Sequence, residues 1–291
     1  MARRPGTKCY WLDAHTGDLV AILEARPKRH FYGHGVFDSA GEYLYLTEND
    51  IDNPGDGIIG VYRFQKNKLT FDREFSSYGI EPHELVWLAQ DESLAIANGG
   101  LRTVAGSRVK LDLEHMQSSL VVVSVAGDLL SKDTLAEQYN SIRHLDCSDN
   151  GSLVCVHQFK RDEMESQSLV SIKRVDQPLV EFRVDQIQQL NMNHYSASVA
   201  IHSGLNLMAV TAPRGNRLLI WDLVSERNIL DQYLPDCAGL AATLDGFLVS
   251  SGQAACTQLD YLGLDELGQG RFTQRTLDMP KGGWDNHLIL V

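Results

Sequence analysis

Histidine is the residue type whose placement in this sequence most suggests chemistry. A short phrase recurs along the chain, in which a polar residue stands immediately before a short apolar run. In four copies that polar residue is histidine, at His34, His83, His144 and His287. Neutral imidazole is a good ligand for iron, copper or zinc, so convergence of these side chains would make a transition-metal site. Two alternatives stay open. Each histidine could cap its own repeat by bonding backbone, or the set could receive an anion or another small ligand.

Other polar side chains stand in loops that we expect beside these histidines. Hard oxygen donors that suit calcium are Glu48, Asn49, Asn98 and Asn286. Positive charge is supplied by Arg102, Arg143 and Arg214. These arginines could bind a carboxylate or phosphate in a bidentate manner, or pair with acids such as Glu48 and Glu84. We predict ligand-binding roles for these four oxygen donors, for the three arginines and for Glu84, and we predict no catalytic residue.

The spacing of the recurring phrase predicts the fold. Its copies follow one another at intervals of 41 to 61 residues, which suits one four-stranded propeller blade per repeat. Each repeat contains short apolar or period-2 runs bounded by turn residues, and almost nothing has the pattern of a long amphipathic helix. We therefore predict an all-β chain that forms a β-propeller. Loops of antiparallel strands alternate between two faces, so the leading residues and the loops between second and third strands should share one face.

The two ends of the chain suggest an incomplete blade. Residues 2–13 resemble residues 211–222, which span the end of one strand, a turn and the next strand. We predict one domain over residues 1–291, with a partial blade at 1–33 and a last strand at 287–291. Complete blades should start near residues 34, 83, 144, 196 and 237. Closure could give six blades, but we favour a seven-bladed parent fold with an incomplete N-terminal blade.

Composition excludes some function classes. The 291 residues are 43% hydrophobic and 22% charged, and the net charge of −12 argues against nucleic acid as a partner. No apolar run approaches the roughly 18 residues that span a membrane. The five cysteines show no C-x-x-C spacing. The pairs Cys147–Cys155 or Cys237–Cys256 could form disulfides in an oxidising compartment, and buried free thiols are the alternative.

Several motifs resemble one bacterial family. They are residues 30–34, 47–50, 79–85, 97–100, 211–216 and 284–288. Together they make the whole chain similar to the β-propeller family catalogued as domain of unknown function 1513, of WD40 or YVTN type. The resemblance implies a periplasmic protein, because family members look exported, often by a twin-arginine signal that this chain does not display. It also implies partners among imelysin-type iron-uptake proteins and haem redox proteins, whose genes typically lie nearby.

The predicted function is therefore non-enzymatic binding or scaffolding in the acquisition of iron or another redox metal. The ligand site would lie at the axial funnel of the propeller. One alternative is a metal-dependent lactonase-like or esterase-like hydrolase that uses Glu48 and Asn98 in the same funnel. Another is a platform for protein interactions whose histidines are structural.

Overall fold

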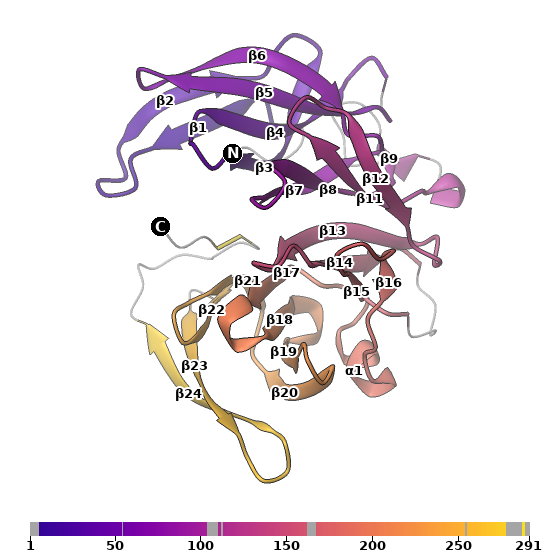
Figure 1. Ribbon diagram of the computed structural model, residues 1–291, viewed down its shortest axis with the longest axis vertical. Coiled ribbons are helices and arrows are strands. Elements are labelled where there is room, and N and C mark those ends of the chain that lie inside the picture. The colour runs from indigo at the N-terminus through magenta and orange to yellow at the C-terminus, as the bar shows by residue number, and fades with distance from the viewer. Residues whose placement is uncertain are drawn as a thin grey trace. The chain divides into compact units, whose positions relative to one another are not determined.

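Nearly all of the regular structure is β-strand (Figure 1). The computed structural model describes residues 6–53, 55–103, 110–111, 113–161, 167–253, 255–277 and 287–288. Within them the chain forms five four-stranded sheets and two two-stranded ones. Strands that are adjacent in a sheet are antiparallel. The prediction of an all-β chain built from four-stranded sheets is confirmed. The chain divides into two compact units, Met1–Arg143 and His144–Val291, which we describe in turn.

The first unit contains two four-stranded sheets. A two-stranded sheet precedes them, made of β1 (Lys8–Leu12) and β2 (Leu19–Glu24). The next sheet has β3 (Arg29–Phe37), β4 (Tyr43–Asp50), β5 (Gly57–Gln65) and β6 (Lys68–Ser76), in chain order. The sheet after it has β7 (Pro82–Leu88), β8 (Ser93–Asn98), β11 (Ser119–Ser124) and β12 (Leu129–Thr134). The long connection from β8 to β11 carries β9 (Arg102–Thr103), β10 (Lys110–Leu111) and the 3-10 turn η1 (Leu113–His115).

The second unit contains the other three four-stranded sheets. The first has β13 (Asn140–Cys147), which crosses the division between the units, β14 (Leu153–Phe159), β15 (Val170–Lys173) and β16 (Val180–Glu181). After the short helix α1 (Gln186–Asn191) come β17 (Ser198–His202), β18 (Leu207–Ala212), β19 (Arg217–Asp222) and β20 (Arg227–Tyr233). The last sheet has β21 (Cys237–Ala242), β22 (Gly246–Ser251), β23 (Cys256–Leu264) and β24 (Gly270–Leu277). The two turns η2 (Ser203–Leu205) and η3 (Pro213–Gly215) flank β18.

Burial falls from the second strand of a sheet to its fourth. Every residue of β8 is buried, whereas exposed residues predominate in β12 of the same sheet. A strand whose two faces are both covered loses the alternation of apolar and polar residues. This explains the continuous apolar runs of the second strands. Polar side chains near the ends of these strands are consequently buried, where a group without a hydrogen-bond partner is costly.

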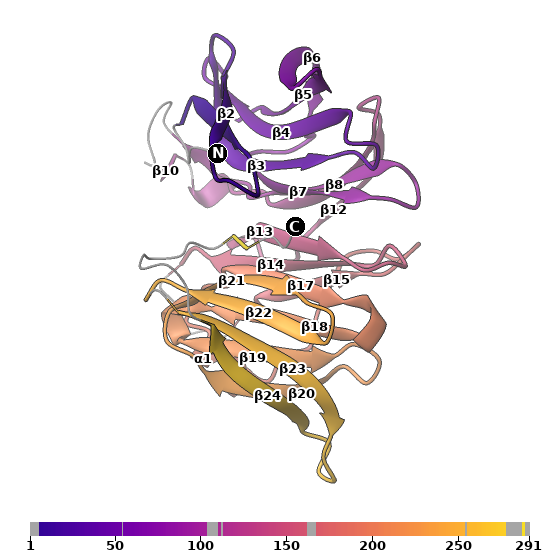
Figure 2. The same ribbon diagram turned by 90° about the vertical axis from the view of Figure 1, so that its left-hand side faces the viewer.

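The cores lie between neighbouring sheets of the same unit. In the first unit Tyr45 and Ile59 pack with Leu94 and Ile96 of the next sheet. In the second unit Ile220 belongs to a core that also contains Phe247, and the two sheets lie side by side in Figure 2. The five cysteines are free thiols, so the disulfide alternative is not realised. None of the described helices is long and apolar enough to span a membrane.

Candidate functional site

In β3, β7 and β21 the recurring phrase of the sequence corresponds to an irregularity in the pairing of the first strand with the second. In β3 the pairing with β4 shifts between Phe31 and Gly35, and this irregular stretch contains His34. In β7 the pairing with β8 shifts between Pro82 and Glu84, so His83 is the additional residue. A bulge bends the strand and turns a side chain away from the regular alternation. The polar residue can therefore point elsewhere while the following apolar residues remain in the core.

These two irregular strands bring three predicted residues together within the first unit. The Nδ1 atom of His34 lies 3.1 Å from Oε1 of Glu84. The ring centroids of His34 and His83 are 5.1 Å apart, and the rings are tilted by 45°. His34 is only 9% exposed, and Thr47 on β4 fixes its backbone by donating a hydrogen bond to the His34 carbonyl. Two imidazoles and one carboxylate are ligand types for a transition metal.

Arg143 contacts the same group of side chains. Its Nη1 donates to Oε1 of Glu81 at 2.8 Å and lies 3.3 Å from Nδ1 of His83. A guanidinium has no acceptor, so Nδ1 of His83 accepts this hydrogen bond and the ring proton is on Nε2. Gly99 permits the close approach, because a Cβ there would lie 2.8 Å from Glu81 Oε2 and 3.2 Å from Arg143 Cζ. Arg143 thus pairs with an acid, one of the two roles open to it from sequence.

Glu48 is enclosed in a separate ionic group. It is fully buried, and the Tyr62 hydroxyl donates to its Oε1 at 2.6 Å. Arg26 donates to its Oε2 at 3.0 Å and also bonds Glu74. Burial raises the pKa of Glu48, and the hydrogen bonds from Tyr62 and Arg26 oppose this increase. Both carboxylate oxygens are occupied by protein donors.

The amides predicted beside Glu48 belong to other surroundings. The side-chain nitrogen of Asn98 donates to the Ser77 carbonyl at 3.1 Å, and its Oδ1 is buried without a hydrogen bond. Asn49 is also buried, and its Oδ1 has no partner. Glu48 and Asn98 share no hydrogen-bond partner in the part of the chain that the structure describes. The geometry does not join them into the catalytic set that a hydrolase would require.

The second unit has its own pair of imidazoles. The rings of His144 and His287 have centroids 5.1 Å apart, and ring nitrogens of the two approach within 4.8 Å. Arg214 lies over the ring of Tyr195, with Cζ 4.5 Å from the ring centroid, a cation–π contact. Asn286 lies outside the described residues. The expectation that all four histidines share one centre stays a prediction.

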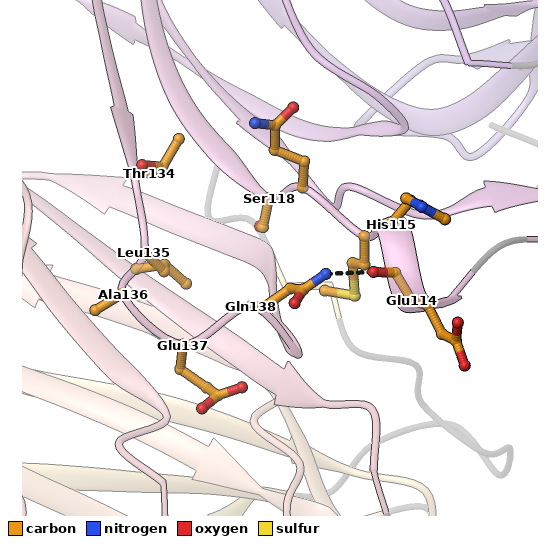
Figure 3. A pocket seen from close by; sticks show the side chains of 10 residues that line it. Glu114, His115, Ser118, Thr134, Leu135, Ala136, Glu137 and Gln138 are labelled. Atoms are coloured by element: carbon orange, nitrogen blue, oxygen red, sulfur yellow. Dashed lines mark hydrogen bonds between the residues drawn. The ribbon is translucent and has the colours of Figure 1, made fainter.

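Three cavities in the first unit lie away from the predicted histidines. The one in Figure 3, about 500 Å³ in volume, lies between residues 114–118 and 134–138, and Gln138 donates to the Glu114 carbonyl across it at 2.6 Å. Cavities of about 230 and 290 Å³ share Ile80, Arg102 and Gln117. Arg102 was predicted as a ligand residue, but Lys132, which lines the smaller cavity, was not. Lys132 lies on β12, the fourth strand of its sheet, and no motif in the sequence marks it as a ligand residue.

Comparison with solved structures identifies the class of fold. The chain is similar to the periplasmic gluconolactonase PpgL of Pseudomonas aeruginosa, with TM-score 0.61, 13% identity, and coverage of 92% of this chain and 78% of that chain. A chain of the mitotic checkpoint complex gives TM-score 0.66 at 13% identity, covering 94% of this chain and 74% of that one. Sqt1 of Saccharomyces cerevisiae gives TM-score 0.53 at 16% identity, covering 91% and 79%. The protein is a β-propeller of the WD40-like kind. Its number of blades stays a prediction.

The particular family follows from the sequence. The family described as "Protein of unknown function (DUF1513)" matches residues 1–291, and the chain belongs to it. The predicted family membership is thereby confirmed. No curated protein matches the chain.

Proposed function

We propose that the protein is a non-enzymatic binding propeller that holds a divalent transition metal at His34 and Glu84 in its first unit. The observation that carries the proposal is the 3.1 Å separation of His34 Nδ1 and Glu84 Oε1. Nitrogen and oxygen ligands lie about 2.0–2.2 Å from zinc, so two ligands of one tetrahedral ion lie about 3.3 Å apart. The same separation suits a carboxylate that bonds one ring nitrogen and orients the other toward a metal. Glu84 supports metal binding in both arrangements.

His144 and His287 are the corresponding candidates in the second unit. Their ring nitrogens approach within 4.8 Å, and neutral imidazole is the commonest metal ligand in proteins. His83 is the weaker candidate of the four predicted histidines. The Arg143 guanidinium occupies the Nδ1 lone pair of His83 and places positive charge beside it, and both effects oppose binding of a cation.

Binding fits the arrangement better than hydrolysis does. A hydrolase of the predicted kind needs Glu48 to reach a substrate or a metal. Glu48 is fully buried, and Tyr62 and Arg26 bond its two oxygens. The likeness to a gluconolactonase is a likeness of fold.

The setting that we propose is the acquisition of iron or another redox metal in the periplasm, with imelysin-type or haem redox proteins as partners. The support for this setting is the resemblance of the sequence to exported propellers. Fractionation of cells that express the natural gene tests the location. Recovery of the protein with the cytoplasmic fraction would contradict the proposed setting. It would not contradict the proposed metal site.

Metal content tests the site directly. Purified protein is incubated separately with iron, copper and zinc salts, desalted, and measured by elemental analysis. We expect near-stoichiometric binding of at least one metal and its loss in the double variant His34→Ala with Glu84→Gln. His144→Ala with His287→Ala tests the second pair in the same way.

A matched control is His15→Ala, because His15 is an exposed histidine in a turn of the same unit. This variant should bind as much metal as the unchanged protein. Circular dichroism melting of each variant shows that the fold is retained. Metal-free unchanged protein, or equal metal in the His34–Glu84 variant, would overturn the proposal.

A further inference from the structure

A polar cavity in the first unit contains two cationic side chains. It has a volume of about 230 Å³ and is lined by both Arg102 and Lys132. Arg102 stands at the start of β9, and Lys132 belongs to β12. The rest of the lining includes backbone of Gly55, Gly57 and Gly79.

Arg102 differs from three other arginines of this unit in having no acidic partner among the described residues. Arg26, Arg29 and Arg143 each bond at least one carboxylate. The guanidinium of Arg102 makes no hydrogen bond or ion pair with any residue that the structure describes, and it is exposed. Its donors are therefore available to a ligand. A guanidinium binds carboxylate and phosphate groups through two parallel hydrogen bonds.

Both cations are positioned by their surroundings. A Cβ at Gly55 would lie 2.8 Å from Nε of Arg102, so the missing side chain makes room for the arginine. The ammonium of Lys132 donates to the Tyr78 carbonyl at 2.8 Å. That bond uses one of its three donors and leaves two for a ligand. The Tyr78 hydroxyl donates to the Gly127 carbonyl at 2.9 Å, which holds the side chain of this lining residue.

The local charge favours an anion although the chain as a whole has a net charge of −12. Asp56 is the single carboxylate among the described residues that line this cavity. It forms no ion pair with Arg102 or Lys132, since neither pair comes within salt-bridge distance in the described part of the chain. Two cations and one acid leave the cavity positive. Such a cavity attracts small anions to an otherwise acidic surface.

The neighbouring cavity indicates the size of the ligand. It has a volume of about 290 Å³, shares Ile80, Arg102 and Gln117 with the first, and adds His115. Figure 3 shows His115 again, on the margin of the third cavity. An inorganic ion would fill only the part beside Arg102. A ligand with an organic body would also contact Ile80 and the polar side chains beyond it.

We propose that Arg102 and Lys132 bind the carboxylate or phosphate group of a small organic anion. The guanidinium of Arg102 donates hydrogen bonds to two oxygens of the group, and the ammonium of Lys132 contributes a second positive charge. The body of the ligand lies along Ile80 toward Gln117 and His115. This site is distinct from the metal site, with which it shares no residue.

Isothermal titration calorimetry on the full chain tests the site with three probes, namely inorganic phosphate, succinate and 3-phosphoglycerate. We expect 3-phosphoglycerate to bind more tightly than inorganic phosphate, because only the former reaches the second cavity. Arg102→Gln should weaken binding about tenfold or more, the usual effect of losing charge-assisted hydrogen bonds. Arg102→Lys should restore little of the lost affinity, because an ammonium cannot donate two parallel hydrogen bonds to the group. Lys132→Gln should have a smaller effect.

The matched control is Arg63→Gln, which removes an exposed arginine of β5 in the same unit. It should leave binding unchanged. Preference for succinate or for the phosphates decides which anionic group the site takes. The proposal is overturned if no probe binds, if Arg102→Gln binds like the unchanged protein, or if Arg63→Gln weakens binding equally.

Discussion

The two units build four-stranded sheets in the same way but treat their buried polar positions differently. In the first unit some of these positions carry charge, as at Glu48 and Glu81, which are 0% and 1% exposed. Each acid bonds an arginine, Arg26 or Arg143. Among the described residues of the second unit, the buried polar side chains are histidines, serines and threonines, without a carboxylate, lysine or arginine. His157 bonds the Ser171 hydroxyl at 2.9 Å, and Thr211 donates to the Ala238 carbonyl at 2.6 Å.

The comparison shows that sheets of this kind can contain buried ion pairs as well as buried neutral side chains. The two solutions differ in what happens when a partner is removed. An unpaired buried charge costs several kcal/mol, whereas a lost neutral hydrogen bond costs about 1–3 kcal/mol. Mutations at comparable depth should therefore be more damaging in the first unit. The following predictions test this difference, beginning with the largest effect.

The largest effect is expected for Arg26→Met. It leaves Glu48 buried with only Tyr62 as a partner, while the methionine keeps part of the packing that Arg26 makes over Phe71. We expect a loss of about 3 kcal/mol in the free energy of unfolding at pH 7. Without Arg26 the pKa of Glu48 rises further, so the loss should shrink as the pH falls toward 5. Urea unfolding at both pH values measures it.

Two controls accompany this variant. Glu48→Gln combined with Arg26→Met removes the buried charge and should cost less than Arg26→Met alone. Arg174→Met breaks the exposed pair with Glu226 in the second unit and should cost below about 1 kcal/mol. Equal losses for Arg26→Met and Arg174→Met would refute the proposed difference between the units.

An intermediate effect is expected for His157, and it depends on pH. Burial lowers the pKa of His157 to about 3. The unfolded chain, with a histidine pKa near 6.5, binds more protons below that pH, so this group's contribution to stability is present above pH 6.5 and is lost as the pH falls toward 3. Between pH 7 and pH 5 the loss is about 2 kcal/mol.

The variant His157→Gln has an amide that can donate to or accept from the Ser171 hydroxyl, and it cannot be protonated. Its unfolding free energy should therefore fall by about 2 kcal/mol less than that of the unchanged protein between pH 7 and pH 5. His202→Gln serves as the comparison, because His202 lies in a more exposed position of the same unit. An identical pH dependence for His157→Gln and the unchanged protein would contradict the assignment.

The smallest effect is expected for Thr211→Val. The change keeps the shape of the side chain but leaves the buried Ala238 carbonyl without the threonine hydroxyl. A neutral hydrogen bond of this kind contributes about 1 kcal/mol. Thermal unfolding should show a small decrease in midpoint. A loss as large as that of Arg26→Met would mean that charge does not distinguish the two units.

The sequence predicted the sheets well because their pattern is local. Apolar runs, turn residues and the repeat interval depend on neighbours along the chain, and the five four-stranded sheets begin at Arg29, Pro82, Asn140, Ser198 and Cys237. The predicted starts were near residues 34, 83, 144, 196 and 237. The observed strands begin earlier at β3 and β13, and in β3 the residues from Arg29 to Phe31 already pair with β4.

The polar contacts could be predicted only in part. The repeat predicted that His34 and Glu84 lie near each other at the starts of neighbouring first strands, but not that they contact each other directly. The enclosure of Glu48 by Arg26 and Tyr62 depends on residues from other strands whose side chains meet only in the folded sheet. The same holds for Lys132, which reaches the Arg102 cavity from β12. No spacing rule relates such residues.

The irregular pairing in the first strands has a consequence for how the family can diversify. Strand register shifts at Phe31–Gly35 in β3, at Pro82–Glu84 in β7 and at Cys237–Leu240 in β21. One additional residue in β7 and β21, and two in β3, separate the orientation of the leading side chain from the alternation that fills the core. Substitution there can change chemistry without disturbing the hydrophobic packing. These three strands thus have positions at which a substitution can introduce a new ligand with little effect on the core.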